Sequence, residues 1–235
     1  MFIVEGIWHI GEAVEASAPV EAIFYAPELL KSGFAQELIE KHCDQDIPCF
    51  QTSAEVFTSI AEKENPQGIL AVVRESPAHL ADLNPERFPW GVALVSPQDP
   101  GNVGTILRTI DAVGASGLLL LDSSVDPYHP SAVRASMGSI FWHPIATASF
   151  EEFTVWARGH GYHIYGTSAH GGVSYREVPG YQRPLILLMG SEREGLTSEQ
   201  TAVCEQLIYL PMRGRVTSLN LAIATGVMLY NISTE

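Results

Sequence analysis

The chain has 235 residues, of which 46% are hydrophobic, which suffices for one large domain or two smaller ones and argues against global disorder. Its formal net charge of -14 at pH 7 opposes nucleic-acid binding by a uniformly basic surface. Three cysteines without a CxxC pair argue against a structural zinc site and for a reducing compartment, and the N-terminus lacks the basic segment of a signal peptide, so we expect a cytoplasmic protein.

The first third of the chain is predicted to form a small α/β domain, residues 1–75. Hydrophobic periodicity and cap signals indicate its elements. The expected helices cover residues 5–17, 29–43 and 54–62, the last capped by Ser53, and the expected strands cover 20–26 and 68–73. Three prolines and little periodicity then mark residues 76–90 as a linker.

Residues 91–235 alternate apolar strands with helices. The expected strands cover residues 91–96, 116–122, 162–168, 184–190 and 206–211, and the expected helices cover 102–114, 130–139, 150–159, 197–206 and 218–231. Continuous apolar strands separated by helices are typical of a parallel sheet that is covered on both faces. The last helix has amphipathic spacing, which favours a core helix over a membrane span.

Ligands of such sheets bind beyond the carboxyl ends of the strands, so four loops are candidates for a site: residues 96–104, 166–172, 189–196 and 211–220. In the first loop, Asn102 lies near a helix start and Arg108 lies less than two turns further along, so both could point into one cleft. The alternative is that Asn102 caps the helix and Arg108 is a solvated surface residue.

The loop "MGSEREGL" begins where an apolar strand ends at Gly190, a residue that allows backbone to approach a ligand closely. It matches neither the dinucleotide fingerprint nor a Walker loop. Glu192 is a candidate functional residue, and the alternative is a helix start capped by Ser191. In the loop "PMRGRVTSLN", Ser218 could cap the last helix and Asn220 falls in its first turn. Two polar side chains where one cap suffices suggest a site.

A further stretch, "VRASMGS", places Arg134 near small polar residues that suit a phosphate or ribose contact. All three lysines lie within residues 1–75, whereas the remaining residues carry nine arginines and no lysine. Arginine makes planar, bidentate phosphate contacts, so these arginines are candidates for placed contacts with RNA. The histidines show no HxH or HExxH spacing, no GxSxG elbow is present and Cys204 has no evident base partner, so neither a metal site nor a hydrolase is expected.

Three motifs in order, "NVGTILRT", "LLMGSEREGL" and "LPMRGRVTSLNLAIATGVMLY", resemble the SpoU (TrmH-like) branch of the SPOUT RNA methyltransferases over about residues 90–232. The first 75 residues resemble the small substrate-recognition domain that precedes the catalytic domain in many ribosomal-RNA members. The resemblance implies an α/β fold with a knotted, trefoil SPOUT domain at residues 91–235. It also implies S-adenosylmethionine as cofactor and a homodimer with active sites near the interface.

The resemblance assigns residues to roles by position. The catalytic positions fall on Asn102, Arg108, Glu192, Ser218 and Asn220. Residues expected to surround the cofactor are Thr167, Ser168, Ala169, Leu188, Met189, Gly190, Leu210, Met212 and Leu219. Candidate contacts with the RNA substrate are Arg134, Ser136, Arg213 and Arg215.

The function that the resemblance implies is S-adenosylmethionine-dependent 2′-O-ribose methylation of RNA, with ribosomal RNA as the leading substrate. Two alternatives stay open: the same reaction on transfer RNA, or a cofactor- or RNA-binding module with little catalysis, which the acidity favours. The acidity departs from the family pattern most strongly in residues 1–75, which hold 4 Lys+Arg against 13 Asp+Glu.

Overall fold

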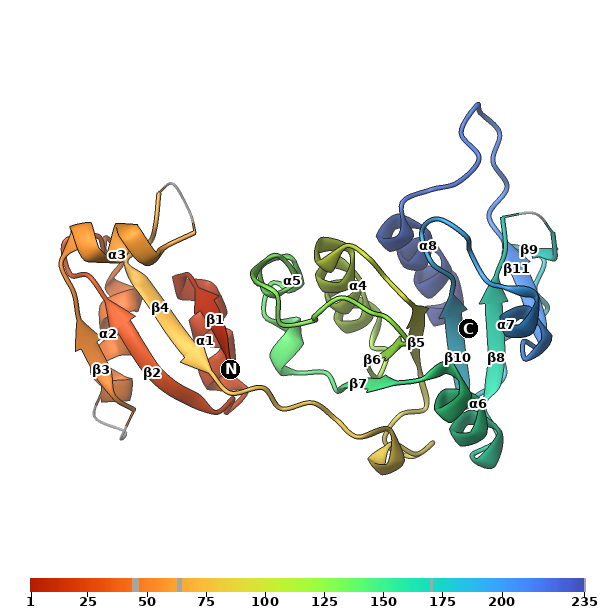
Figure 1. The fold of residues 1–235 in the computed structure, drawn as a ribbon, viewed down its shortest axis with the longest axis horizontal. Coiled ribbons are helices and arrows are strands. Elements are labelled where there is room, and N and C mark those ends of the chain that lie inside the picture. Colours follow the sequence, from red (N-terminus) through yellow and green to blue (C-terminus); the bar gives the residue numbers. More distant parts are fainter. Residues whose placement is uncertain (44–46, 63–64, 170, 235) are drawn as a thin grey trace.

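The computed structural model describes residues 1–43, 47–62, 65–169 and 171–234. It contains two α/β units, each built on its own sheet, with a connecting segment that runs along the second unit (Figure 1).

The first unit is a four-stranded sheet in the order β1-β4-β2-β3. Its strands are β1 (Phe2–Glu5), β2 (Val20–Tyr25), β3 (Cys49–Gln51) and β4 (Ile69–Val73), and its helices are α1 (Ile7–Glu15), α2 (Gly33–Cys43) and α3 (Ala54–Ile60). The predicted cap of α3 is confirmed, because the Val56 amide donates to Ser53 Oγ at 3.3 Å. Strands β1 and β3 were not predicted; with four and three residues they are too short to show a period of two.

The second unit is a seven-stranded sheet in the order β7-β6-β5-β10-β8-β11-β9, and all of its strand pairs are parallel. Its strands are β5 (Trp90–Val95), β6 (Leu118–Leu121), β7 (Ile145–Ala148), β8 (His163–Thr167), β9 (Val173–Ser174), β10 (Leu185–Met189) and β11 (Gln206–Tyr209). Its helices are α4 (Pro100–Val113), α5 (Pro130–Ser136), α6 (Phe150–Gly159), α7 (Ser198–Ala202) and α8 (Leu221–Ser233). The expected fold class, a parallel α/β domain preceded by a small α/β domain, is confirmed.

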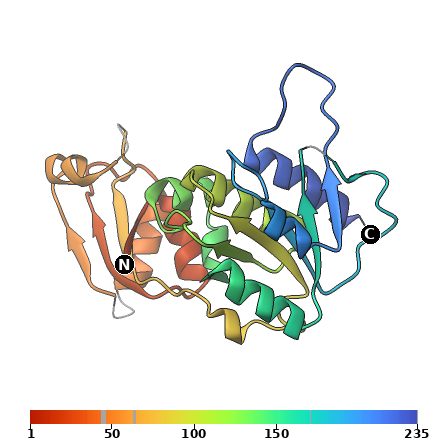
Figure 2. The same ribbon diagram turned by 45° about the vertical axis from the view of Figure 1, so that its right-hand side comes forward.

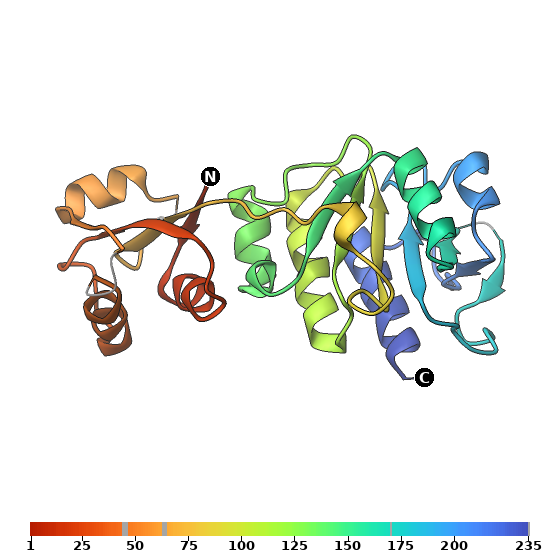
Figure 3. The same cartoon turned by 90° about the horizontal axis from the view of Figure 1, so that it is seen from below.

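Helices cover both faces of the parallel sheet, as Figure 3 shows from below. Alternate residues of each strand enter different cores, because successive side chains of a strand point to opposite faces. Leu187 belongs to the cluster that includes α4 and α8, whereas Leu188 belongs to the cluster that includes Phe153 and Trp156 of α6. This two-sided burial explains why the strands are apolar throughout.

The segment expected to be a linker is ordered against the second unit. It contains a short 3-10 helix, η1 (Leu80–Asp82), and an isolated parallel bridge joins Ala78 to Ala146. The Trp156 indole donates to the carbonyl of Leu83 at 3.0 Å, and the Tyr162 hydroxyl donates to that of Phe88 at 2.7 Å. These contacts with distant residues hold the segment in place, although its sequence has no helix or strand periodicity.

The last helix, α8, differs from the amphipathic helix that was expected. Leu221, Met228 and Leu229 are buried against the sheet and α4, yet Ile223 and Tyr230 are each 57% exposed. The helix is therefore apolar on two faces. Among the described residues, none of the helices combines the length and the hydropathy that a bilayer crossing requires.

Helices α4 and α5 pack with direct backbone contact, and glycine makes this approach possible. A Cβ at Gly104 would lie 2.2 Å from the carbonyl oxygen of Ala132 and 2.8 Å from Ala135 Cβ. Only a residue without a side chain fits there, so the position of α5 against α4 is fixed at Gly104.

We therefore expect Gly104→Ala to lower the free energy of unfolding by about 1–3 kcal/mol, because the added methyl group must push two backbones apart. Urea denaturation followed by circular dichroism measures the change. The matched control is Gly11→Ala in α1, whose new Cβ meets the Phe34 ring at an ordinary 3.6 Å. Equal stability of the two variants would contradict the close packing of α4 on α5.

Candidate active site

Four loops converge at the carboxyl edge of the parallel sheet. Strands β5, β10, β8 and β11 are consecutive neighbours, so the loops that follow them must lie side by side. The loops after β8, β10 and β11 line a cavity of about 310 Å³, within the range of small-molecule sites. The loop after β5 contacts this group through the Gln98 amide, which donates to the Glu192 carboxylate. The loop between β11 and α8 extends away from the body of the domain (Figure 2). Met212, Ser218 and Leu219 of this loop line the cavity.

A chain of three polar side chains links three of these loops. The Asn220 amide donates to Asn102 Oδ1 at 2.9 Å, and the Asn102 amide donates to Glu192 Oε1 at 3.3 Å. Asn102 is only 7% exposed, and both the carbonyl oxygen and the NH2 group of its side chain have hydrogen-bond partners inside the protein. The carboxylate of Glu192 is held in turn by the backbone amide of Gln98, at 3.3 Å from Oε2.

This geometry decides between the alternatives for Asn102 and for Ser218. The cap of α4 is Asp99, whose carboxylate accepts from the Gly101 amide at 2.8 Å, so Asn102 is free of a capping role. The cap of α8 is Asn220, which accepts from the amides of Ala222 and Ile223 at 2.9 and 3.3 Å. The expected cap at Ser218 is wrong; this residue lines the cavity instead.

Gly190 shapes the wall of the cavity. A Cβ at this position would lie 2.2 Å from the carbonyl carbon of Gly195, because residues 191–195 fold back against the strand end. The turn is closed by the Gly195 amide, which donates to the Ser191 carbonyl at 3.0 Å. Ser191 Oγ accepts from the Glu194 amide, so Ser191 stabilises a turn and does not start a helix.

The structure brings most of the predicted cofactor residues to this one cavity. The lining includes Thr167, Ser168, Ala169, Met189, Gly190, Leu210, Met212 and Leu219, together with Glu192 and Ser218. Leu188 is the exception, because its side chain is fully buried on the opposite face of the sheet. Only its carbonyl oxygen approaches the site, where it accepts from Thr167 Oγ1 at 3.4 Å.

Arg108 does not share a cleft with Asn102 within one chain. Six residues of helix rotate a side chain by about 600°, which leaves the two residues on different faces of α4. Arg108 is exposed and does not line the cavity. It lies on the side of α4 that carries Thr105 and Thr109, which form a shallow groove with α8.

The predicted RNA contacts divide into two groups. Arg213 and Arg215 are exposed on the extended loop, where they can reach a ligand. Ser136 is 1% exposed and donates to the Val133 carbonyl at 2.7 Å, so its expected contact with RNA is wrong. Arg134 pairs with Glu62 of the first unit at 2.7 Å.

Several cavity residues were missed by sequence reasoning. Arg193 and Glu194 lie in a quoted motif but carry no pattern of their own, and Met228 enters the cavity from α8, far along the chain. Gln98, which holds Glu192 from outside the cavity, was missed because its role uses the backbone amide, which any residue supplies.

Burial raises the pKa of the Cys204 thiol to about 11, which makes it a poor nucleophile. Among the described residues, no group of three His, Cys, Asp or Glu side chains could hold a metal ion.

Two family models together cover nearly the whole chain. The model described as the SpoU rRNA Methylase family matches residues 89–230. The model described as the MRM3-like substrate binding domain matches residues 1–71.

Individual relatives extend over both units. The 23S rRNA (uridine(2479)-2′-O)-methyltransferase of Streptomyces viridochromogenes is 34% identical over 97% of this chain and 81% of its own. The 23S rRNA (guanosine(2553)-2′-O)-methyltransferase RlmP of Bacillus subtilis is 28% identical over 98% of this chain and 88% of its own. A crystal structure of an AdoMet-bound rRNA methyltransferase from Sinorhizobium meliloti superposes with a TM-score of 0.89 at 35% identity, over 99% of this chain and 87% of that one.

The capping role of Asn220 gives a test of the site's framework. Asn220→Ala should lower the free energy of unfolding by about 1 kcal/mol, because two amides at the start of α8 lose their acceptor. Ser218→Ala should leave it unchanged within about 0.5 kcal/mol, because Ser218 is an exposed loop residue. Thermal denaturation of the two variants measures both values, and the reverse ranking would return the cap to Ser218.

Proposed function

Because the chain belongs to the SpoU rRNA methylase family, whose model matches residues 89–230, we propose that it methylates the 2′-hydroxyl of a ribose in ribosomal RNA with S-adenosylmethionine as donor. The observation that carries the proposal is the hydrogen-bonded chain from Glu192 through Asn102 to Asn220, beside a cavity of cofactor size. Relatives that span both units are named as 23S rRNA 2′-O-methyltransferases, which supports ribosomal RNA over transfer RNA and favours a cytoplasmic location.

The cavity fits a cofactor that is partly apolar and cationic. Its walls are apolar at Met189, Leu210 and Leu221, which suits an adenine ring, and the strand ends offer backbone donors and acceptors. The charged residues of the lining are Glu192, Glu194 and Arg193, so carboxylates outnumber the single cation. An excess of negative charge stabilises a ligand that carries a sulfonium and an ammonium group.

Bound in this cavity, S-adenosylmethionine supplies an electrophilic methyl group. The protein must align the ribose hydroxyl, exclude water and stabilise the oxygen as its proton leaves. Asn102 is suited to orientation, because its amide is fixed at both ends by Glu192 and Asn220. Ser218 lies on the cavity wall, where its hydroxyl can contact the ribose.

Arg108 is assigned a role with phosphate rather than with the proton. A guanidinium group remains protonated in proteins, so it is a poor general base. It is well suited to hold the phosphate next to the target ribose and to stabilise negative charge that develops on the oxygen. This role requires Arg108 to lie close to a cavity, which its own chain does not provide.

We propose that the protein forms a homodimer and that the second copy of the chain provides the cavity for Arg108. Ile223, Val227 and Tyr230 are exposed on one side of α8 at the spacing of a single helical face, next to the part of α4 that carries Arg108. A contiguous exposed apolar face marks an interaction surface. Packing two such faces together would bury them and carry the Arg108 of each protomer toward the partner's cavity.

The proposal predicts that the wild-type protein transfers a labelled methyl group from S-adenosylmethionine to ribosomal RNA. Arg108→Ala should reduce the rate at least about a hundredfold, the effect of losing one preorganised charged donor. Its affinity for the cofactor, measured by calorimetry, should persist because Arg108 does not line the cavity.

The matched control is Arg158→Ala, which removes an exposed arginine from α6 on the other face of the sheet and should keep the wild-type rate. Mapping of 2′-O-methylated nucleotides in treated RNA identifies the substrate. Methylation of transfer RNA alone would reject the ribosomal assignment, and near-normal turnover of Arg108→Ala would reject the role of the arginine.

The proposed dimer is tested at its apolar face. Ile223→Asp should weaken self-association at least about a hundredfold, because it places a charge in the centre of the interface. Sedimentation velocity over a concentration series measures the change, and methylation should fall in parallel. Val155→Asp replaces another exposed apolar residue, on α6, and should leave the dimer intact. A wild-type protein that sediments as a monomer while fully active would exclude the proposal.

A further inference from the structure

The first unit docks on the second through a dedicated interface. Phe2 of β1 lies against Tyr128, with ring centroids 4.7 Å apart, and against Phe141, with centroids 6.2 Å apart. Tyr128 precedes α5, and Phe141 ends the 3-10 helix η2 (Ser139–Phe141). An apolar contact thus joins the edge strand of one unit to the α5–η2 segment of the other.

Polar contacts surround this aromatic centre. The Trp8 indole of α1 donates to the Met137 carbonyl at 3.1 Å. In the opposite direction, the Trp142 indole donates to the Glu12 carboxylate of α1 at 2.9 Å. Each tryptophan therefore contributes a directional contact from one unit to the other.

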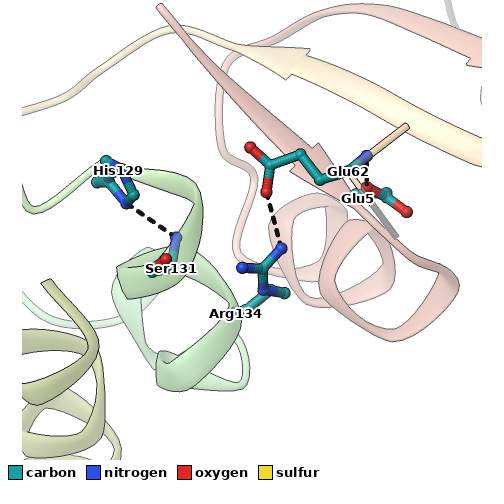
Figure 4. Close-up of polar contacts among 5 residues, drawn as sticks. All are labelled: Glu5, Glu62, His129, Ser131 and Arg134. Atoms are coloured by element: carbon teal, nitrogen blue, oxygen red, sulfur yellow. Dashed lines mark hydrogen bonds and ion pairs between the residues drawn. The ribbon is translucent and has the colours of Figure 1, made fainter. Parts of the chain in front are cut away.

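An ion pair adds a further contact, which Figure 4 shows in close-up. Arg134 of α5 pairs with the Glu62 carboxylate at 2.7 Å, while the Glu62 backbone amide donates to Glu5 Oε2 at 3.0 Å. Glu5 is buried at the end of β1, so Glu62 is attached to the framework of the first unit. The pair is half exposed, which makes it one part of the docking rather than its main source.

The turn after α5 is shaped for α1. Met137 and Gly138 both have positive φ, 53° and 99°. A Cβ at Gly138 would lie 2.5 Å from Glu12 Cγ, so the turn approaches α1 more closely than any other residue would permit. A flexibly tethered domain has no need of such a fit.

The interface connects directly to the proposed active site. Helix α5 is fixed against α4 at Gly104, where Ala132 leaves no room for a side chain. Two residues before Gly104 lies Asn102, the centre of the polar chain. The first unit therefore rests on the same helix pair that positions Asn102.

We propose that this interface holds the substrate-binding unit at one fixed distance from the methyl-transfer site and thereby selects which nucleotide of a folded RNA is modified. The proposal rests on the RNA methylation proposed above and goes beyond it, because it makes Trp8, Glu62, Arg134 and Trp142 positioning residues for substrate selection. A folded RNA is rigid and is recognised largely by shape, so a fixed distance between two contact points determines which ribose reaches the cavity.

The charge of the first unit supports this assignment. Glu12 and Glu62 face the second unit and are bonded to its side chains, so these two carboxylates contribute to docking. Arg134 was expected to bind RNA, and its pairing with Glu62 gives it a structural partner instead. If Arg134 serves docking, exchanging the charges of Arg134 and Glu62 should preserve function. If Arg134 binds RNA phosphate, the same exchange should impair it.

The experiment compares the full-length wild type with Trp8→Ala/Trp142→Ala, with Arg134→Glu and with the exchanged pair Glu62→Arg/Arg134→Glu. Phe34→Ala/Arg158→Ala is the matched control, since both residues are exposed and outside the interface. Small-angle scattering measures the radius of gyration of each protein. Methylation is mapped on a folded ribosomal RNA fragment and on a short single-stranded RNA that contains the same nucleotide.

We expect the double tryptophan variant to have a larger radius of gyration and at least about tenfold lower kcat/KM on the folded RNA, with methylation spread to neighbouring nucleotides. Turnover of the short RNA and affinity for S-adenosylmethionine should equal those of the wild type. Arg134→Glu should show a smaller effect of the same kind. The exchanged pair should recover kcat/KM on the folded RNA to within about threefold of the wild-type value, because the two residues are energetically coupled.

Unchanged site selection by the double tryptophan variant would overturn the proposal, as would an unchanged radius of gyration. A loss in Arg134→Glu that the exchanged pair does not restore, at a constant radius, would assign Arg134 to phosphate binding instead. If the wild type methylated no RNA, the proposed function would fail and substrate selection with it. The scattering data would still decide whether the units are docked.

Discussion

The buried amide of Asn102 is the contact on which the site depends. It lies in the first turn of α4, accepts from Asn220 at the start of α8 and donates to Glu192 in the loop after β10. A buried amide must satisfy both its donor and its acceptor, so these two partners are required together. Asn102 thereby holds in one place two segments that lie 90 and 118 residues from it in sequence. The order of the strands makes this possible, since β10 lies between β5 and β8.

The sequence predicted the features that depend on local pattern or on a motif. Continuous apolar strands such as β6 and β10 indicated the parallel sheet, and Ser53 marked a helix start. Features that depend on distant contacts were not predictable. The segment around Leu83 has no periodicity, because the indole of Trp156 and the edge of the sheet hold it in place. Ser136 has the composition of a phosphate contact, yet the packing of α5 on α4 turns it inward.

Arg108 lies in a motif that matches the family, yet its side chain is not where we expected it. Sequence spacing suggested that it shares a cleft with Asn102, whereas the helical repeat separates the two side chains around α4. The same helix thus holds Asn102 inside the protein, bonded to Glu192 and Asn220, and presents Arg108 outward beside an apolar face. Neither feature has an evident purpose in a monomer. The proposed dimer through α8 would explain both, because it would cover Ile223 and Tyr230 and bring the cation to a site.

The structure shows where several of the acidic side chains of this negatively charged chain lie. Net charge counts all carboxylates equally, but their partners differ. Within the first unit, Glu12 and Glu62 pair with Trp142 and Arg134 across the interface between the units, so they stabilise an internal surface. Glu192 and Glu194 line the proposed cofactor cavity, whereas Arg213 and Arg215 are exposed on the loop beside it. Long-range repulsion of RNA is screened within about 10 Å at ordinary ionic strength, so at the proposed RNA contact these nearby arginines would outweigh the net charge of the chain. An acidic protein can therefore bind RNA where its arginines are concentrated, provided that the two units are held so that the RNA meets them.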